Sequence, residues 1–251
     1  LIILGIALIL FGILSFYLSK WSLSPIEYAW RQQKQFTSDA SHELRTPIAV
    51  ILANLDVLNS MPMLPEQQPW ILRTKTEALR MKKLIEDLLF LARQDAKTQN
   101  LPMESVDISS ILWERCLSFE ALAFEKGIKL DYDIADNLKI LGHEGNVKQL
   151  LSILLDNAMK YCGEKGSVYL KAYCVKEKTF VLIQNSGEPI DKEDLKHIFE
   201  RFYRTDKSRA RTEGGYGLGL AIAKTIVESM HGRISVLSDK ENGTVFKLEL
   251  G

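Results

Sequence analysis

The sequence predicts a multidomain α/β protein with a transmembrane helix, a dimeric helical hairpin that builds a four-helix bundle, and an α/β sandwich. Three observations support this. Residues 1–18 carry no charge, residues 36–98 repeat apolar side chains at heptad spacing, and residues 105–251 alternate between helical and strand patterns. We therefore divide the 251 residues into a span at 1–19, a juxtamembrane helical linker at 20–35, the hairpin at 36–98 and the sandwich at 105–251.

The first 18 residues form the predicted transmembrane helix. Thirteen of them are Leu, Ile or Phe, and these favour insertion by roughly −4 to −8 kcal/mol in total. A signal peptide would need a basic start and a small-residue cleavage site, and a buried core helix is normally shorter. Basic residues from Lys20 onward predict a cytoplasmic remainder, anchored at the cell membrane. Because the chain begins with Leu1 rather than Met, we expect it to be the C-terminal part of a longer protein.

Two heptad runs predict the helical hairpin. Their a and d positions are Ser41, Leu44, Ile48, Ile51, Leu55 and Leu58 in the first run, and Ile71, Thr74, Ala78, Met81, Ile85, Leu88 and Ala92 in the second. Pro62, Pro65 and Pro69 interrupt the pattern between the runs. One hairpin cannot bury its own apolar stripe, so we expect a homodimer with a four-helix bundle. The alternative is a helix that packs on its own domain.

The heptapeptide SHELRTP at residues 41–47 sets a histidine beside a carboxylate on the first helix. His42 falls at heptad position b, so its imidazole is expected to face solvent. A neutral imidazole is a nucleophile near pH 7, and the adjacent Glu43 could set its tautomer. Thr46 lies at i+4 from His42 on the same helix face. Taken alone, the histidine could also be an ordinary surface residue.

The C-terminal part reads as helices on one face of a mixed sheet. Helices are predicted at Ile108–Glu125, Val147–Tyr161 and Ile222–Met230, and strands at Leu130–Ile134, Ser167–Val175, Phe180–Gln184, Ile234–Leu237 and Val245–Leu250. Gly127 is a natural left-handed cap for the first of these helices.

One helix of this part carries polar residues suited to phosphate and metal chemistry. Asn157, Lys160 and Tyr161 stand at i, i+3 and i+4 on one face of the helix predicted at Val147–Tyr161. An amide oxygen can complete a Mg²⁺ shell that phosphates and water otherwise fill, and an ammonium group can meet a phosphate. A solvated helix face is the alternative.

Three further segments follow along the chain. Residues 185–190, NSGEPI, form a predicted turn that contains Asn185 and Gly187. An aromatic and then basic stretch at 198–211 includes Arg204 and Arg209, and it could close over phosphates or be a solvated loop. The glycine-rich segment 214–220 would let backbone N–H groups approach phosphates at a helix N-terminus. Its spacing excludes both GxGxxG and GxxxxGK[ST].

In this order the motifs resemble those of sensor histidine kinases of bacterial two-component systems. Residues 36–47 resemble the phosphoacceptor box, and the later segments, with Asn242-Gly243-Thr244, resemble the boxes of Bergerat-type ATPases. The resemblance implies that ATP phosphorylates His42, that Glu43 is the base, and that Thr46 positions a water for phosphatase chemistry. The phosphoryl group would pass to an Asp in the receiver domain of a response regulator.

The resemblance also implies a nucleotide site with ATP and Mg²⁺ as cofactors, and Asn157 as the metal ligand. Its ATP-binding residues would be Asn157, Lys160, Tyr161, Asn185, Gly187, Arg204, Arg209, Gly215, Gly217, Leu218, Gly219 and Thr244. Three positions depart from the family: Ile153 replaces an Asn, Asn185 an Asp, and Pro189 a Gly. Replacing a charged acceptor at Asn185 by a neutral one costs roughly 1 kcal/mol, which weakens ATP binding by somewhat less than tenfold.

Two alternatives from other classes remain at this point. The departures are compatible with a degenerate kinase that acts mainly as a scaffold or phosphatase, and the nucleotide motifs alone would suit a non-kinase ATPase. A net charge of zero gives no reason to expect a nucleic-acid partner. Cys116, Cys162 and Cys174 lack the spacing of a disulfide framework or a zinc site.

Overall fold

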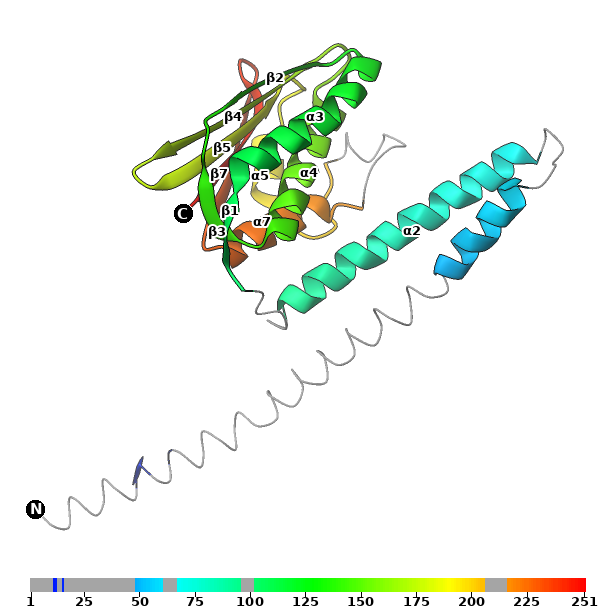
Figure 1. The fold of residues 1–251 in the computed structure, drawn as a ribbon, viewed down its shortest axis with the longest axis horizontal. Coiled ribbons are helices and arrows are strands. Elements are labelled where there is room, and N and C mark those ends of the chain that lie inside the picture. The colour runs from blue at the N-terminus through cyan, green and yellow to red at the C-terminus, as the bar shows by residue number, and fades with distance from the viewer. Residues whose placement is uncertain (1–10, 13–14, 16–47, 61–66, 96–101, 206–215) are drawn as a thin grey trace, which may run out of the picture. The chain divides into compact units, whose positions relative to one another are not determined.

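The structure is a computed structural model that describes residues 11–12, 15, 48–60, 67–95, 102–205 and 216–251 (Figure 1). The chain divides into two compact units, Leu1–Gln99 and Asn100–Gly251, and each is described by itself. Of the predicted transmembrane helix, only residues 11, 12 and 15 are described, and they are helical. No helix within the described ranges is long and apolar enough to cross a bilayer. The rest of the predicted span lies outside those ranges.

The described part of the first unit includes residues of both predicted helical runs, and Ser41 and Leu44 lie outside it. One helix covers residues 48–60, and helix α2 covers Gln68–Asp95. An ion pair joins them, because Lys75 Nζ lies 2.6 Å from a carboxylate oxygen of Asp56. Pro69 was expected in the connection between the two runs, but it lies in the first turn of α2. A proline is tolerated there because that N–H has no partner within the helix.

The heptad positions of this unit divide into buried and exposed sets. Ile48, Leu55 and Ala78 are buried. Met81 and Leu88 occupy seam positions of α2 but remain 48% and 38% exposed. The hairpin by itself therefore leaves part of its apolar stripe uncovered, as a helix pair that needs a partner does.

The second unit is built on a five-stranded mixed sheet. In spatial order its strands are β2 (Lys129–Ile134), β4 (Ser167–Val175), β5 (Lys178–Asn185), β7 (Gly243–Leu250) and β6 (Arg233–Asp239). β2 runs parallel to β4, and the other pairs are antiparallel. Helices α3 (Ile108–Lys126), α4 (Glu144–Tyr161) and α7 (Gly219–Ser229) lie on one face of the sheet (Figure 1). The predicted α/β sandwich is confirmed.

Three short elements were not predicted. Strands β1 (Glu104–Asp107) and β3 (Lys139–Gly142) pair antiparallel in a separate two-stranded sheet, and α5 covers Lys192–His197. A strand of four residues shows at most two periods of alternation, which is too few to separate it from a loop.

The core lies between the sheet and the three helices. Every second residue of the central strands points inward, as the burial of Val181, Ile183 and Phe246 shows. From the helices, Leu154 and Ile222 are fully buried against this layer. The helices therefore present their polar faces away from the sheet, and one of those faces, on α4, carries the candidate site.

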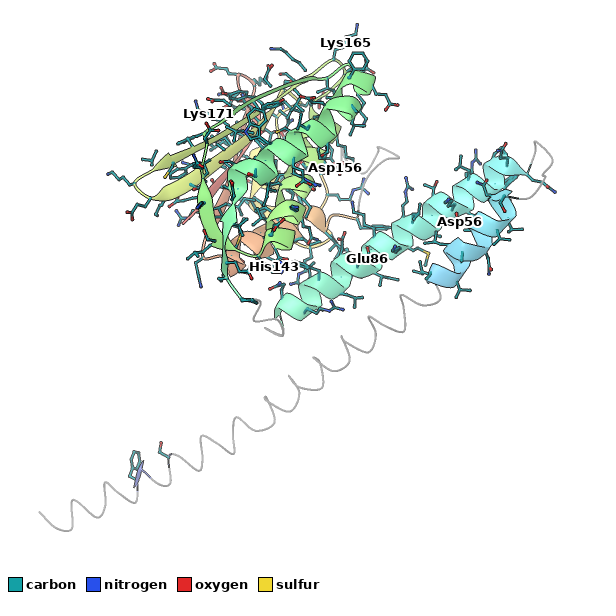
Figure 2. All side chains as sticks on the ribbon, viewed as in Figure 1. Asp56, Glu86, His143, Asp156, Lys165 and Lys171 are labelled. Carbon is teal, nitrogen blue, oxygen red and sulfur yellow. The ribbon has the colours of Figure 1, made fainter. Side chains whose placement is uncertain are left out.

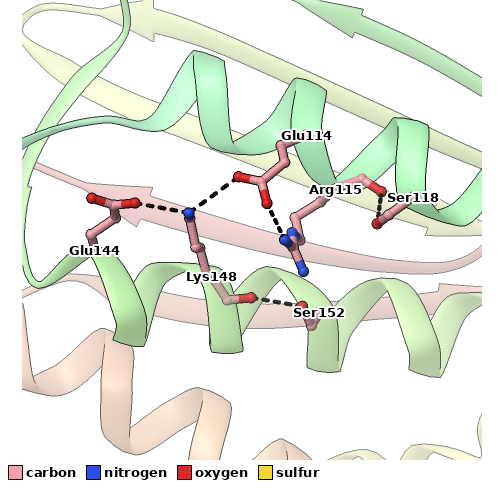
Figure 3. A network of polar contacts seen from close by, with 6 residues as sticks. All are labelled: Glu114, Arg115, Ser118, Glu144, Lys148 and Ser152. Atoms are coloured by element: carbon pink, nitrogen blue, oxygen red, sulfur yellow. Dashed lines mark hydrogen bonds and ion pairs between the residues drawn. The ribbon is translucent and has the colours of Figure 1, made fainter.

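A polar network ties α3 to α4 at the surface (Figure 3). Lys148 Nζ lies 2.8 Å from Glu144 and 3.2 Å from Glu114, which also binds Arg115. Hydrogen bonds from Arg115 and Lys148 lower the pKa of Glu114, and hydrogen bonds to Glu144 and Glu114 raise the pKa of Lys148. Because these groups are solvated, the network contributes little to stability.

Candidate functional site

Helix α4 supplies the first part of the site. Asn157, Lys160 and Tyr161 lie half-buried in its last turns, on the side away from the buried Leu154 and Leu155. The Lys160 ammonium nitrogen lies 5.2 Å from the centroid of the Tyr161 ring. Figure 2 labels two other residues of this region, His143 just before α4 and Asp156 within it. The predicted polar face therefore exists, and an amide, an ammonium group and an aromatic ring lie together on it.

The end of strand β5 supplies a buried amide. Asn185 is only 2% exposed. In the pairing of β5 with β7 it stands opposite Thr244, which is 4% exposed. Within the described residues the Asn185 side chain has no hydrogen-bond partner. The Asn185 amide atoms keep some contact with solvent. Among the described residues, the side-chain atoms that are both fully buried and without a partner are Arg115 Nε and His143 Nδ1, and no atom of Asn185 is one of them. Since buried polar groups almost always have partners, this amide is a strong candidate to bind a ligand.

The loop after Asn185 packs closely on the end of α4. A Cβ atom on Gly187 would lie 1.7 Å from the carbonyl oxygen of Tyr161, so only glycine fits there. Ser186 holds the same loop, because its Oγ accepts from the Ser167 N–H at 2.8 Å and donates to the Cys162 carbonyl at 3.1 Å. Sequence reasoning missed Ser186, and its place in the Asn-Ser-Gly turn was the only signal.

The start of α7 supplies backbone donors. Gly217 has a φ of 75°, and a Cβ there would lie 2.6 Å from the carbonyl oxygen of Tyr203. The Phe202 N–H donates to the Gly217 carbonyl at 3.0 Å, which ties together the chain on either side of residues 206–215. Leu218 is buried, and Gly219 opens the helix. The first N–H groups of a helix lack partners within it and favour anions.

Helix α7 packs against α4. A Cβ on Gly219 would lie 3.4 Å from Cγ2 of Ile153, so this isoleucine packs against the first turn of α7. Gly187 joins the 185–187 loop to the end of α4, and Asn185 stands opposite Thr244 of β7. The structure therefore brings together four predicted segments: the α4 face, the 185–187 loop, the start of α7 and β7. The position of Ile153 explains how an apolar residue is accommodated where the resemblance expects an amide.

Several predicted site residues lie outside the described residues. These are His42, Glu43, Thr46, Arg209 and Gly215. Arg204 is described and half-buried, and it precedes the segment 206–215. Cys162 follows Tyr161, but burial raises the pKa of its thiol and makes it a poor nucleophile.

Family comparisons match two regions of the chain. Residues 142–251 match the histidine kinase-, DNA gyrase B- and HSP90-like ATPases. Residues 32–97 match the phospho-acceptor domain of histidine kinases. The first match contains every element of the site described above, and the second contains His42 and α2.

Curated relatives extend the similarity across both regions. The sensor protein DltS of Streptococcus agalactiae serotype V is 38% identical over 92% of this chain and 58% of DltS. The sensor protein CiaH of Streptococcus pneumoniae serotype 4 is 33% identical over 94% of this chain and 53% of CiaH. The chain therefore spans little more than half the length of these curated relatives.

Two solved structures are similar to this chain. Full-length ShkA in complex with AMPPNP superposes with a TM-score of 0.75 at 28% identity, over 86% of this chain and 45% of ShkA. The catalytic domain of the histidine kinase ThkA superposes with a TM-score of 0.54, also at 28% identity, over 60% of this chain and 95% of that domain.

Proposed function

Because the chain belongs to the sensor histidine kinases of two-component systems, a family of ATP-dependent protein-histidine kinases, we propose that ATP phosphorylates it on His42. The phosphoryl group then passes to an Asp in the receiver domain of a response regulator. The observation that carries this proposal is the presence of a phospho-acceptor match and an ATPase match on one chain. A phosphoryl donor site and a nucleophile are both needed for this chemistry.

The chain has predicted ligands for each part of the nucleotide. Asn185 and Thr244 would bind the base, and the first N–H groups of α7 would bind phosphate oxygens. Lys160 would neutralise phosphate charge from the α4 face. Arg204 comes just before the segment 206–215, and Arg209 belongs to it; this segment would close over the phosphates. Gly187, Gly215 and Gly217 would let the backbone approach the ligand without side chains in the way.

Asn157 fits a Mg²⁺ ion that arrives with the nucleotide. Mg²⁺ prefers oxygen ligands and usually keeps water and substrate phosphates in its shell, so one protein oxygen suffices. Within the described residues no group of three or more His, Cys, Asp or Glu side chains could hold a metal ion. The half-buried Asn157 amide on the same face as Lys160 would be the protein ligand. When bound, the ion would neutralise charge on the phosphates.

At the acceptor, Glu43 would remove the ring proton of His42 so that the imidazole attacks the γ-phosphorus. The bond between the β–γ bridging oxygen and the γ-phosphorus breaks, and ADP leaves. Positioning and charge neutralisation supply most of the catalysis in such transfers. Thr46 would orient a water for the opposite activity, hydrolysis of the phosphoryl group on the response regulator.

The larger organisation is part of the same proposal. Residues 1–19 would anchor the protein in the cell membrane, residues 20–35 would link this span to the hairpin, and residues 36–98 would form the homodimeric phosphotransfer domain. Residues 105–251 would form the catalytic ATP-binding domain in the cytoplasm. The exposed seam residues of α2, such as Met81 and Leu88, support the dimer.

One alternative keeps specific support. A non-kinase ATPase is disfavoured by the phospho-acceptor match over residues 32–97. A degenerate kinase that acts mainly as a scaffold or phosphatase is the second candidate, because Ile153, Asn185 and Pro189 depart from the family pattern. Mg²⁺-dependent nucleotide binding by the chain separates the active kinase from the degenerate one, since a scaffold does not need to bind a nucleotide.

The chain offers its own control for a labelling experiment. Incubation with γ-labelled ATP should yield a phosphoprotein that is labile in acid and stable in base. His42→Gln should abolish the label, whereas His197→Gln should retain it, because His197 is an exposed residue that contacts Glu200. Label that persists in the His42 variant would overturn the assignment of the acceptor.

A further inference from the structure

We infer that the nucleotide site accepts 6-oxopurine nucleotides, those of guanine and hypoxanthine, as well as adenine nucleotides. The inference rests on the proposed function and names the substrate class of the same site. It starts from Asn185, whose uncharged amide is almost wholly buried, has no side-chain partner within the described residues, and yet is not sealed from solvent. A group in that state is positioned to meet the polar edge of a ligand.

An amide differs from a carboxylate in what it can offer. It carries one acceptor oxygen and a two-donor nitrogen on the same plane, whereas an ionised carboxylate only accepts. The amide can also exchange the places of its oxygen and nitrogen by a half-turn about the last side-chain bond, a torsion with roughly two-fold preferences. Asn185 can therefore present either an acceptor or a donor to the same point in space.

The two kinds of purine differ at the corresponding point. Adenine carries an amino donor at position 6 and an acceptor at N1, and a 6-oxopurine carries an acceptor at position 6 and a donor at N1. An amide can form two hydrogen bonds with either edge. A carboxylate can accept from the adenine amino group, but beside a 6-oxopurine it meets the 6-oxo group acceptor to acceptor and can accept only from the N1–H donor.

The neighbour of Asn185 has the same versatility. Thr244 Oγ1 lies 2.7 Å from Ser238 Oγ, and either hydroxyl can donate to the other. Ser238 also accepts the Ile190 N–H at 2.9 Å, so its hydroxyl hydrogen is available for Thr244. The Thr244 hydroxyl can then serve as donor or acceptor toward a base. Neither of the two paired positions at the ends of β5 and β7 carries a charge that would select one purine edge.

The test compares ADP, IDP and GDP, each with Mg²⁺, by calorimetric titration of the full chain at pH 8. Diphosphates cannot phosphorylate the protein, and IDP differs from ADP at positions 6 and N1 while lacking the 2-amino group of GDP. We expect IDP to bind within about tenfold of ADP, because each base finds the same number of neutral hydrogen bonds. GDP reports in addition whether the site has space for a 2-amino group.

Two variants locate the effect. Asn185→Asp should tighten ADP binding by somewhat less than tenfold and weaken IDP binding by about tenfold or more, so that the preference for adenine widens. Asn137→Asp adds the same charge at an exposed turn position with a φ of 58°, which Asp tolerates, and it should leave the ratio unchanged. Thermal melting of each variant checks that it is folded.

The outcomes separate the inference from the proposed function. Absence of binding by all three diphosphates would overturn the proposed nucleotide site itself. Binding of ADP with IDP more than tenfold weaker in the unmodified chain would overturn only the purine inference, and the proposed kinase would stand. An unchanged ratio in a folded Asn185→Asp variant would also overturn it, since the choice of base would then not depend on this residue.

Discussion

Single atoms decide the shape of the candidate site at Gly187. The loop that follows Asn185 approaches the Tyr161 carbonyl so closely that a Cβ atom would overlap the oxygen. Gly163 lies in a nearby turn and has a φ of 85°, but nothing stands within 4 Å of the place of its Cβ. Gly187 is therefore required by close packing, whereas Gly163 is favoured by its backbone conformation.

Gly187→Ala should weaken ADP binding by more than tenfold and destabilise the C-terminal unit by about 2–3 kcal/mol, because the loop must move away from α4. Gly163→Ala should cost about 1–2 kcal/mol through its left-handed backbone and leave the affinity unchanged. Calorimetric titration and thermal melting measure both effects. An unchanged affinity in Gly187→Ala would contradict the role given to this loop.

At the scale of elements, α3 and α4 begin in different ways. Asp107 caps α3, because its carboxylate accepts from the Ser110 N–H at 3.1 Å. His143 precedes α4 and makes no side-chain cap hydrogen bond. One helix therefore gains a side-chain acceptor at its positive end, and the other does not.

Asp107→Ala should destabilise the C-terminal unit by about 1 kcal/mol at pH 7, or roughly 2–4 °C in its melting temperature. The hydrogen bond from the Ser110 backbone lowers the pKa of Asp107 in the folded state. Its contribution is therefore present above the ordinary aspartate pKa of about 3.9 and is lost as the pH falls through the lower folded value. Melting curves at pH 7 and pH 3 should show the difference between variant and parent shrinking. Asp107→Asn keeps a capping oxygen and should lose less stability.

His143→Asp should have the opposite sign and stabilise the unit by about 1 kcal/mol, because a carboxylate can accept from the free N–H groups of the first turn of α4. Scanning calorimetry of the full chain measures the shift. His143→Ala is the control, since it removes the unpartnered Nδ1 atom without adding a cap. If alanine stabilised as much as aspartate, the gain would come from removing the imidazole rather than from capping.

For the whole molecule, the described part of the hairpin leaves apolar seam residues exposed. Its seam residues Met81 and Leu88 are apolar and exposed, although they follow the same heptad register as the buried Ala78. Burial of apolar area contributes roughly 25 cal/mol per Å². A second hairpin placed against this stripe would therefore stabilise the protein.

Met81→Glu should convert the dimer to monomer at micromolar concentration, because it places a charge in the expected seam. Thr76→Glu adds the same charge at an exposed position outside the seam and should leave the dimer intact. Light scattering of the full chain measures the mass. A dimeric Met81→Glu variant would show that the exposed stripe is not the interface.

Periodicity and local backbone chemistry were sufficient to predict most elements. The helix that became α3 was predicted to end before Gly127, and the structure shows Gly127 as its left-handed cap with a φ of 64°. The four-residue strands β1 and β3 escaped prediction because each acquires its conformation from pairing with the other. Pro69 was assigned to the connection but lies in the first turn of α2, since sequence alone does not distinguish a proline that stops a helix from one near its start.

Residue types and short spacings are local properties, so the sequence is enough to identify the residues that are chemically suited to a nucleotide and the order in which they occur. It does not reveal that Asn185 stands opposite Thr244, that Gly187 abuts Tyr161 or that Ile153 packs on Gly219, and these contacts come from the folded chain. These neighbours are far apart in the chain, and strand register and close packing of the backbone bring them together. That packing also buries the Asn185 amide. The inference about the choice of purine rests on this burial more than on the sequence motif.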